Sequence, residues 1–357
     1  MSKIACYVTG HGFGHVVRVL ELCRNLPEDW EIHLKTTAPK WLIDIIIQRN
    51  CFCYPERTDS GSIQKDCFQL DMEQTLVEAA KLHKEWPLML KKETDWIKSN
   101  DIDVILSDIP PLPFLAADKC RIPSVGLTNF SWDWIYGEYV EHFPEYKYLI
   151  EEFLSTYSKS SLLLRLPFYG DLSAFPNIVD INHIARMGKD IRRYIYEDFG
   201  ISSDCKLILI SFGGLGLDSV DWKKLEELRD YHFFTYSPLP YEVENITYIE
   251  PSEILHPDMV KSVDAVVSKT GYGIVSECIE NQTPLIFCER DYFREYHVLA
   301  KGLNEWDGGV FLKRNELLMG NWKEALDKAS DLKGNISEIP CNGAIEGTKE
   351  ITKLVNG

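Results

Sequence analysis

The sequence has no excess of positive charge. Its 357 residues include 38 lysines and arginines against 55 aspartates and glutamates, a formal net charge of −17. A protein that binds nucleic acid or an anionic membrane needs a basic surface that releases counterions. The composition therefore argues against both as main partners. It does not argue against a small anionic ligand, because helix N-termini bind anions locally.

Clustered cysteines and long apolar runs are also missing. The ten cysteines form no Cys-x-x-Cys pair, and Cys51 and Cys53 are the nearest approach to a cluster, which favours buried thiols over a metal or redox site. No run reaches about 18 apolar residues, so the sequence predicts no membrane span. A strand that has begun by residue 4 leaves no room for a signal peptide. We therefore expect a cytoplasmic protein.

Two common nucleotide-binding signatures are missing as well. No Gly-Lys-Ser/Thr triplet occurs, and the first glycine cluster reads Gly-x-Gly-x-Gly rather than Gly-x-Gly-x-x-Gly. These differences exclude a Walker A loop and a dinucleotide fingerprint. His11 and His15 are four residues apart, but the glycines between them make a poor helix, so a metal pair is not favoured.

What the sequence does contain is a strand, a glycine-rich turn and a helix at its very start. Lys3–Thr9 is a short apolar run typical of a buried parallel strand. Gly10, Gly12 and Gly14 follow, and they allow a sharp turn and a close approach to a ligand. Apolar residues then recur on one helical face, at positions 16, 19, 20, 23 and 26. Such a turn faces anions at the edge of an α/β sheet.

The rest of the chain alternates strands and helices in two cycles. The expected strands are 31–36, 103–107, 122–128, 161–166, 206–211, 232–236, 246–249, 264–268 and 284–288. A long amphipathic helix is expected over 71–98, and Pro87 should kink or divide it. The prolines after residue 108 predict a loop. This alternation indicates an α/β fold of two doubly wound parallel sheets facing one another.

A chain of this length suits two domains. We expect an N-terminal domain over 1–165, a Pro-rich irregular linker over 166–200 and a C-terminal domain over 201–335, each with a Rossmann-like sheet. A closing helix within 336–357 is expected to pack back on the first domain.

Three glycine loops follow three predicted strands, at 10–14, 213–216 and 271–273. Ligands of doubly wound sheets bind beyond the carboxyl ends of the strands, so all three loops are expected to line one cleft. Each loop alone is weak evidence.

Together, the histidine loop 10–15, the Ser211–Gly214 loop and the Ser268–Gly273 loop followed by Glu277 resemble GT-B nucleotide-sugar glycosyltransferases. Distant members are the peptidoglycan GlcNAc transferase and the UDP-glycosyltransferases. The similarity is greatest to the glycosyltransferase-like N-terminal half of plant L-arabinokinases, and it runs through 7–15, 107–108, 128–133, 165–167, 271–273, 290–293 and 308–310. The sugar-kinase half has no counterpart here, so kinase activity is not implied.

The resemblance gives His15 and Asp108 catalytic roles. An acceptor hydroxyl must lose a proton as it attacks the anomeric carbon, which calls for a base such as a histidine. His15 would be that base, and Asp108 matches the aspartate that partners the base in UDP-glycosyltransferases. The alternatives are a ligand contact or structural role for His15 and a turn or loop-capping role for Asp108.

The C-terminal loops would bind the donor. Backbone N–H groups at the start of the helix after Gly273 would meet the charge of the leaving diphosphate, so neither a metal nor a cofactor is expected. Glu277 matches the glutamate that binds the ribose hydroxyls, although a solvated helix face is the alternative. The resemblance implies a UDP-linked sugar as the donor, and the expected donor residues are Gly213, Gly214, Lys269, Thr270, Gly271, Tyr272, Gly273, Glu277, Arg294 and Glu295.

On the acceptor side the candidates are Gly12, Gly14, Arg18, Trp132 and Asp133. Arg18 would either meet a phosphate or form a surface ion pair. Trp132 and Asp133 follow a strand end, where an aromatic side chain beside a carboxylate suits a sugar, while core packing of the tryptophan is the alternative.

We therefore predict an inverting, metal-independent transferase that moves a sugar from a nucleoside-diphosphate sugar to a small-molecule or glycan acceptor. A sugar-nucleotide epimerase or hydrolase and a non-catalytic sugar-nucleotide sensor are the alternatives. The isoleucine-rich segment 40–48 could contact a membrane surface, but a short helix packed on the sheet is favoured.

Overall fold

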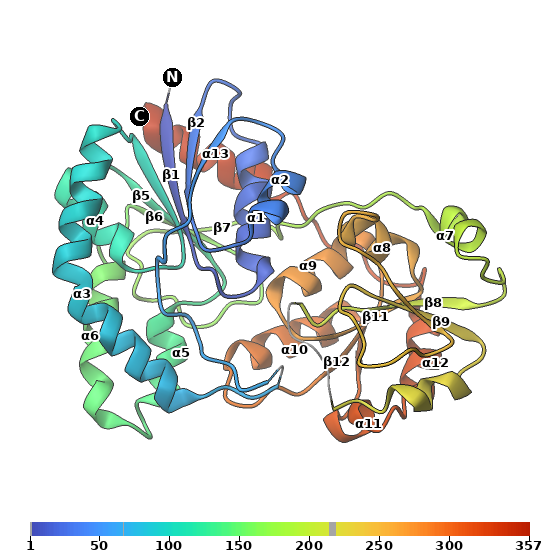
Figure 1. The fold of residues 1–357 in the computed structure, drawn as a ribbon. Helices are drawn as coiled ribbons and strands as arrows, with labels where there is room; N and C mark the ends of the chain where they lie inside the picture. The colour runs from blue at the N-terminus through green and yellow to red at the C-terminus, as the bar shows by residue number, and fades with distance from the viewer. Residues whose placement is uncertain (1, 67, 214–218) are drawn as a thin grey trace.

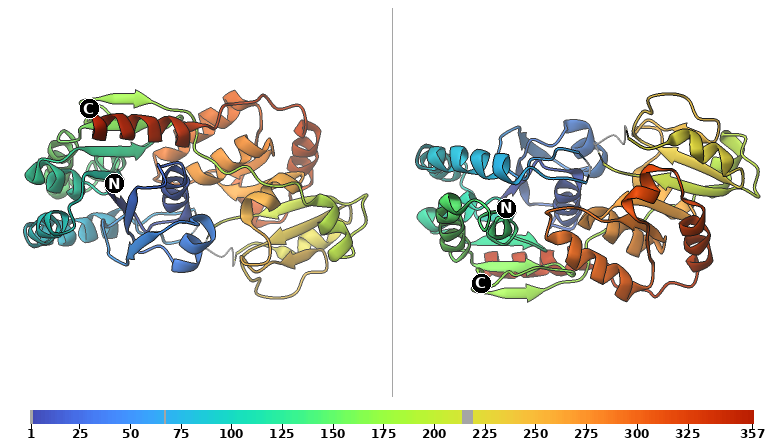
Figure 2. Two further views of the ribbon diagram at one scale, coloured as in Figure 1. Left: turned by 90° about the horizontal axis from the view of Figure 1, so that it is seen from above. Right: turned by 90° about the horizontal axis from the view of Figure 1, so that it is seen from below.

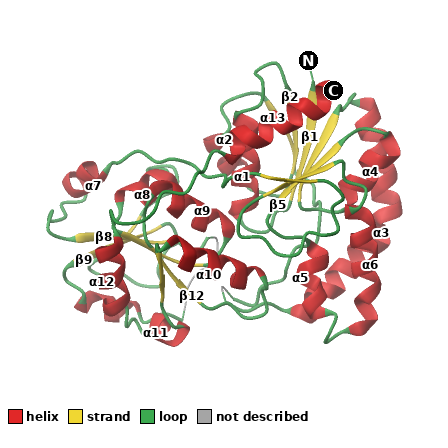
Figure 3. Ribbon diagram, turned by 180° about the vertical axis from the view of Figure 1, so that it is seen from behind, coloured by secondary structure: helices red, strands yellow, loops and turns green. Residues whose placement is uncertain are grey.

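The computed structural model describes residues 2–66, 68–213 and 219–357 of the chain. Its backbone forms two parallel β-sheets, one in each half of the chain, and helices cover both faces of each sheet (Figures 1 and 3). The two-sheet α/β architecture predicted from the sequence is confirmed. Within these described ranges, no helix combines the length and the apolar character needed to cross a lipid bilayer.

The N-terminal sheet has seven parallel strands in the order β3-β2-β1-β4-β5-β6-β7. The strands are β1 (Lys3–Val8), β2 (Glu31–Lys35), β3 (Cys51–Tyr54), β4 (Val104–Asp108), β5 (Ser124–Thr128), β6 (Leu162–Arg165) and β7 (Ile178–Asp180). The order reverses between β1 and β4, which lie side by side in the middle of the sheet. Ligands of doubly wound sheets bind at such a switch point.

Alternating residues of β1 explain why both faces of this sheet are covered. Ile4 and Cys6 belong to an apolar cluster that includes residues of α1, α2 and α13, whereas Ala5 and Tyr7 belong to a second cluster with α3, α4, α5 and α6. The helices of this half are α1 (Phe13–Arg24), α2 (Lys40–Ile46), α3 (Met72–Ser99), α4 (Leu112–Cys120), α5 (Trp132–Tyr139), η1 (Pro144–Tyr146) and α6 (Lys147–Tyr157).

The C-terminal sheet has six parallel strands in the order β10-β9-β8-β11-β12-β13. They are β8 (Lys206–Ile210), β9 (Tyr231–Thr235), β10 (Ile246–Tyr248), β11 (Ala265–Lys269), β12 (Leu285–Cys288) and β13 (Gly309–Phe311). The switch point lies between β8 and β11, the strands that lead into two of the predicted glycine loops. The two sheets therefore repeat one topology.

Helices α8, α9 and α10 pack on one face of the second sheet, and η2, α11 and α12 pack on the other. The helices of the C-terminal half are α7 (Arg192–Asp198), η2 (Trp222–Glu227), α8 (His256–Ser262), α9 (Tyr272–Asn281), α10 (Glu295–Trp306), α11 (Arg314–Leu318), α12 (Lys323–Leu332) and α13 (Gly343–Asn356).

The last helix, α13, crosses back to the N-terminal sheet and packs beside α1, so the two chain ends lie near each other (Figures 1 and 2). Thr348 of α13 donates a hydrogen bond to the carbonyl of Leu22 of α1, at 3.4 Å. The segment 166–200, expected to be an irregular linker, contains β7, which is the edge strand of the first sheet, and α7.

Of the two outcomes expected for Pro87, a kink or a division of the helix, division does not occur, because α3 runs without interruption from Met72 to Ser99 with the proline inside it. A proline removes only one hydrogen bond of the helix ladder, and buried residues on both sides of it, among them Leu76 and Leu90, pack α3 on the sheet. The loop expected after β4 is short, spanning 109–111, because Pro111 and Pro113 lie at the start of α4, where the first turn needs no N–H donor.

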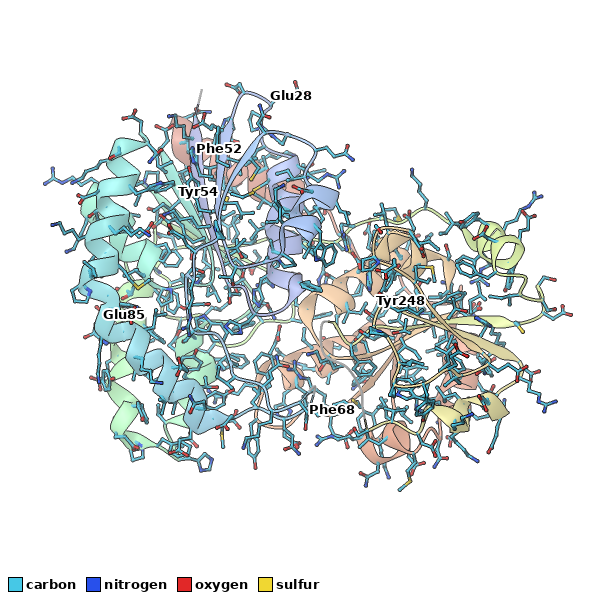
Figure 4. All side chains as sticks on the ribbon, viewed as in Figure 1. Glu28, Phe52, Tyr54, Phe68, Glu85 and Tyr248 are labelled. Carbon is cyan, nitrogen blue, oxygen red and sulfur yellow. The ribbon has the colours of Figure 1, made fainter. Side chains whose placement is uncertain are left out.

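A turn between β3 and α3 reaches from the first domain into the second. Phe68, labelled in Figure 4, is 5% exposed and lies in the apolar cluster of the C-terminal sheet, next to the ring of Phe212. Its carbonyl accepts a 3.0 Å hydrogen bond from the backbone N–H of Asp291, and the Arg314 guanidinium lies 5.5 Å from its ring. One side chain of the N-terminal half thus completes the core of the other half.

We predict that Phe68→Ala destabilises the protein by about 3–5 kcal/mol, the usual cost of deleting a buried phenylalanine ring. Because the ring links two cores, the variant should also unfold in two steps, with the C-terminal half melting first. Urea denaturation followed by fluorescence and circular dichroism would measure both effects. Phe52→Ala is the control, since Phe52 is 49% exposed. Equal stability of the two variants would contradict the prediction.

Candidate active site

His15 lies in the first turn of α1, at the edge of the N-terminal sheet where β1 and β4 end. Gly12 precedes the helix with a φ of 81°, in the left-handed region that favours glycine. Val8 pairs with Asp108 across β1 and β4, which places the carboxylate at the start of α1. Nδ1 of His15 lies 2.9 Å from Oδ1 of Asp108. The predicted base and its predicted partner are therefore in contact.

Arg18, one turn further along α1, forms an ion pair with the same carboxylate. Its Nε donates to Oδ2 of Asp108 and its NH2 to Oδ1, both at 2.6 Å. Asp108 is 0% and Arg18 3% exposed. Burial raises the pKa of a carboxyl, but the charges of Arg18 and His15 outweigh it and hold the pKa of Asp108 below its ordinary value. Arg18 does form an ion pair, but a buried one rather than the expected surface pair.

The two domains touch at two glycines. A Cβ atom on Gly273 of α9 would lie only 2.9 Å from the Cα of Gly14 in α1. Gly12 and Gly271 precede these helices, and neither helix has a side-chain hydrogen bond capping its N-terminus. Two helix N-termini with uncapped N–H groups therefore meet at one place, where an anion would be stabilised by both.

Glu277 on α9 is enclosed by two basic side chains. Nε of Arg186 donates to Oε1 at 2.7 Å, and Nδ1 of His256 lies 2.6 Å from Oε2. The imidazole's other nitrogen lies 2.9 Å from Oγ of Ser211, at the end of β8. Burial opposes ionisation, but Arg186 and His256 outweigh it and lower the pKa of Glu277 to about 2. Both carboxylate oxygens are occupied, so the ribose hydroxyls that Glu277 was predicted to bind would have to share or displace these partners.

The predicted phosphate loops lie at the carboxyl ends of β8 and β11. Gly213 has a φ of 70°, and a Cβ atom added there would meet nothing within 4 Å among the residues that the structure describes. Gly214 lies outside the described residues. Nζ of Lys269 is 3.4 Å from Oε1 of Gln64, which belongs to the turn that carries Phe68. The hydroxyl of Thr270 is buried and has no hydrogen-bond partner among the residues the structure describes.

Tyr272, predicted to bind the donor, is instead buried between the domains. Its hydroxyl lies 3.0 Å from Nδ1 of His183, and the Arg18 guanidinium lies 5.1 Å from its ring. The side chain belongs to the apolar cluster of the N-terminal sheet. Its contacts therefore join α9 to the first domain.

Arg294 and Glu295 also join the domains. NH1 of Arg294 donates to the carbonyl of Trp134 in α5 at 2.8 Å. Oε1 of Glu295, which is 4% exposed, accepts from Nδ2 of Asn129 at 2.8 Å. These residues were predicted to contact the donor sugar, but their side chains are engaged by the N-terminal half.

Trp132 lies in the core, as the alternative interpretation of this residue had it. It is 3% exposed, and its Nε1 donates to Oδ2 of Asp59 at 2.8 Å. Oδ1 of the same carboxylate accepts from the hydroxyl of Thr9 at 2.9 Å. Asp133 is largely buried, and burial raises its pKa to about 6. An open aromatic shelf is therefore not formed by Trp132.

The sequence-based interpretation missed Asp59, Asn129, Arg186 and His256. Asp59 lies in a polar run of unusually low exposure, and Asn129 directly follows β5, as Asp108 ends β4. The position of Asn129 at a strand end was a usable signal. Arg186 comes from an irregular segment, and His256 begins α8 with no recognisable motif around it, so no signal marked either residue. Among the described residues, no three His, Cys, Asp or Glu side chains are grouped so that they could hold a metal ion.

We predict that Glu277→Gln lowers stability by about 3 kcal/mol at pH 7, because it leaves Arg186 and His256 without their anionic partner. A carboxyl with a lowered pKa stabilises the fold above its ordinary pKa and loses that contribution as pH falls. Wild-type stability should therefore fall between about pH 4.5 and pH 2, and that of the variant should fall less. Urea denaturation across this range measures both, with Glu28→Gln, at an exposed position, as control. A parallel fall in the variant would contradict the assignment.

We predict that Gly273→Ala weakens the contact between the two helix N-termini. Alanine is favoured over glycine within a helix by about 1 kcal/mol, so the substitution without a clash would raise the melting temperature. A lower melting temperature would therefore report the steric clash of the new Cβ with Gly14. Gly271→Ala is the matched control, because a Cβ there meets nothing within 4 Å. Calorimetry and hydrogen exchange at the starts of α1 and α9 measure the effect. A Gly273→Ala variant as stable as Gly271→Ala would show that the backbones do not touch.

No family model matches the chain. It is 32% identical over 353 residues to an L-arabinokinase of Arabidopsis thaliana, a match that covers 96% of this chain. It covers 33% of that protein, so the chain spans about a third of the relative's length rather than the expected half.

Several solved structures that resemble this one are glycosyltransferases. The calicheamicin glycosyltransferase CalG4 shares 15% identity at a TM-score of 0.61, with 99% of this chain and 98% of that chain covered. MurG of Acinetobacter baumannii shares 14% at 0.55, covering 99% and 100%. A UDP-glucosyltransferase of Polygonum tinctorium shares 11% at 0.64, covering 100% and 99%. The chain therefore has the GT-B fold of these glycosyltransferases, and along nearly its whole length it is similar to one third of an L-arabinokinase.

Proposed function

We propose that this protein is an inverting, metal-independent glycosyltransferase that uses a nucleoside-diphosphate sugar. One observation carries the proposal. The partly exposed His15, paired with the buried Asp108 of β4, lies in the first turn of α1, where that helix meets the start of α9. A proton acceptor and an anion-binding helix end are thus adjacent, which is what sugar transfer from a nucleotide requires.

In this proposal, His15 takes the proton from the acceptor hydroxyl. An imidazole that donates its Nδ1 hydrogen to Asp108 keeps an unprotonated Nε2, which accepts the proton of the acceptor hydroxyl during attack. The imidazolium formed in this step is stabilised by the buried carboxylate at 2.9 Å. A single base that activates the acceptor gives direct displacement and hence inversion at the anomeric carbon.

In this proposal, α9 stabilises the leaving diphosphate. Its N-terminus, after Gly271, offers uncapped N–H groups and the positive end of a helix dipole, equivalent to about half an elementary charge. These groups would take the stabilising role that a divalent cation has in other transferases. Because Gly14 and Gly273 are in contact, binding of a diphosphate here would require the starts of α1 and α9 to move apart locally, with the Asn129–Glu295 hydrogen bond between the domains kept.

The similar proteins suggest which donors to test. One neighbour of this fold, VinC, was crystallised with dTDP, and another is named as a UDP-glucosyltransferase. The relative of higher identity is named for L-arabinose. A suitable panel therefore holds UDP- and dTDP-linked hexoses together with UDP-L-arabinose. Kinase activity is not proposed, because the chain spans only a third of that relative.

A second candidate is a sugar-nucleotide-binding protein without turnover. It is favoured by the grip of Arg18 on both oxygens of Asp108, which leaves the carboxylate less charge to share with His15. This candidate predicts binding of a nucleotide sugar with no release of nucleoside diphosphate.

We predict that the wild-type protein releases nucleoside diphosphate from at least one donor, in the presence of EDTA, and that His15→Ala slows this release by about 10²–10⁴-fold. A coupled assay of diphosphate release measures the rate, and NMR of the glycoside formed gives the anomeric configuration. His142→Ala, at an exposed position on the surface, is the control. Binding without release would favour the second candidate, and absence of binding to every donor would contradict both.

A further inference from the structure

A chain of hydrogen bonds crosses from the second domain to His15. It begins at Glu295 on α10, passes through Asn129 after β5 to Arg18 on α1, and ends at the Asp108–His15 pair. The successive contacts measure 2.8, 3.0, 2.6 and 2.9 Å. Glu295, Asn129, Arg18 and Asp108 are all at most 4% exposed. Solvent therefore competes little for these hydrogen bonds.

Glu295 fixes the direction of the Asn129 amide together with the carbonyl of Phe168, which accepts from the same Nδ2 at 3.5 Å, against 2.8 Å for Glu295. An ionised carboxylate only accepts hydrogen bonds, so it selects the NH₂ end of the amide, and Nδ2 of Asn129 donates to Oε1 of Glu295. The amide oxygen then faces Arg18 and accepts from NH1 at 3.0 Å. The reversed amide would bring its hydrogens against the guanidinium, donor against donor.

Each N–H group of Arg18 that faces the site has an acceptor other than His15. Nε donates to Oδ2 of Asp108, and NH2 donates to Oδ1 of Asp108 and, at 3.4 Å, to Oγ1 of Thr128. Thr128 can accept because its own hydrogen is donated to the carbonyl of Phe130 at 2.6 Å. The NH2 group lies 3.0 Å from Nδ1 of His15. A tilt of the planar guanidinium would therefore direct one of its hydrogens toward that nitrogen.

The direction in which that NH2 group donates decides the form of the imidazole. While its hydrogens go to Asp108 and Thr128, Nδ1 of His15 carries a hydrogen and donates it to Asp108, so Nε2 is free to accept a proton. If a hydrogen turned toward Nδ1, the imidazole would carry its own on Nε2 and could not act as a base.

We propose that Asn129 and Glu295 are positioning residues that hold His15 in its base-competent tautomer, and that this tautomer is secured only when the second domain docks on the first. The inference rests on the proposed function, because it gives Glu295 a role in proton transfer rather than in contacting the donor sugar. It also gives Arg18 a role, because its guanidinium binds both the Asn129 amide oxygen and the Asp108 carboxylate and so couples their positions.

The test combines a spectroscopic and a kinetic readout. In protein with ¹⁵N-labelled histidine, the ring-nitrogen shifts of His15, assigned with His15→Gln, report its tautomer without any substrate. We expect Glu295→Leu to move these shifts toward the Nε2-protonated form and to lower kcat on the order of 10- to 100-fold, as the loss of partners that orient a functional histidine does, with KM for the donor changed less than about 3-fold. Glu295→Gln keeps an accepting oxygen and should restore both.

We call the hydrogen-bonded chain from Glu295 to His15 the relay. Two further variants distinguish its effect on the His15 tautomer from a general effect of domain docking. Tyr139→Phe deletes another hydrogen bond between the domains, from its hydroxyl to the carbonyl of Tyr292 at 2.9 Å, and should leave the His15 shifts unchanged. Thr128→Val removes an acceptor of Arg18 within the first domain and should shift the tautomer even if Glu295→Leu does not fold.

Unchanged His15 shifts in both Glu295→Leu and Thr128→Val would overturn the relay, and so would an equal effect of Tyr139→Phe. These outcomes are independent of turnover. If the wild-type protein released no nucleoside diphosphate from any donor, the proposed function would fail while the tautomer measurement still decided the relay.

Discussion

The ion pair between Arg18 and Asp108 is the interaction on which the site depends. A carboxylate with no exposed surface is strongly destabilising unless a charged partner and hydrogen bonds compensate it, and the guanidinium supplies both, at 2.6 Å to each oxygen. Arg18 follows His15 by three residues on α1, so the two side chains lie on one face of the helix. Fixing Arg18 on the end of β4 therefore also fixes His15 beside Asp108.

The second domain completes this arrangement at three places of different character. Gly14 and Gly273 bring two helix starts into backbone contact, Asn129 and Glu295 pair polar groups across the boundary, and Phe68 carries an apolar ring from one core into the other. Polar contacts specify one orientation, while buried apolar side chains such as the ring of Phe68 and that of Tyr272 add apolar stabilisation. The relative position of the domains is thus linked to the state of the histidine.

Much of the fold could be predicted from the sequence, because apolar runs that end in glycine mark buried parallel strands such as β1, β8 and β11. The contact of His15 with Asp108 also followed, from a strand end and a family resemblance. The rest depends on tertiary contacts. β7 has only three residues, too few for a pattern, and an arginine on an amphipathic helix suggests the surface until its partner on another strand is known. Likewise, nothing near Glu277 in the sequence indicates Arg186, and nothing near Phe68 indicates its place in the other domain.

The central claim is that a nucleotide sugar binds where α1 and α9 begin, with its sugar against His15. A crystal structure of the protein with UDP tests it most directly. The account predicts the diphosphate at the N-terminus of α9 beside Gly271 and Gly273, with its terminal phosphate toward His15 and the starts of α1 and α9 slightly apart. A nucleotide bound elsewhere, or a diphosphate pointing away from His15, would contradict it.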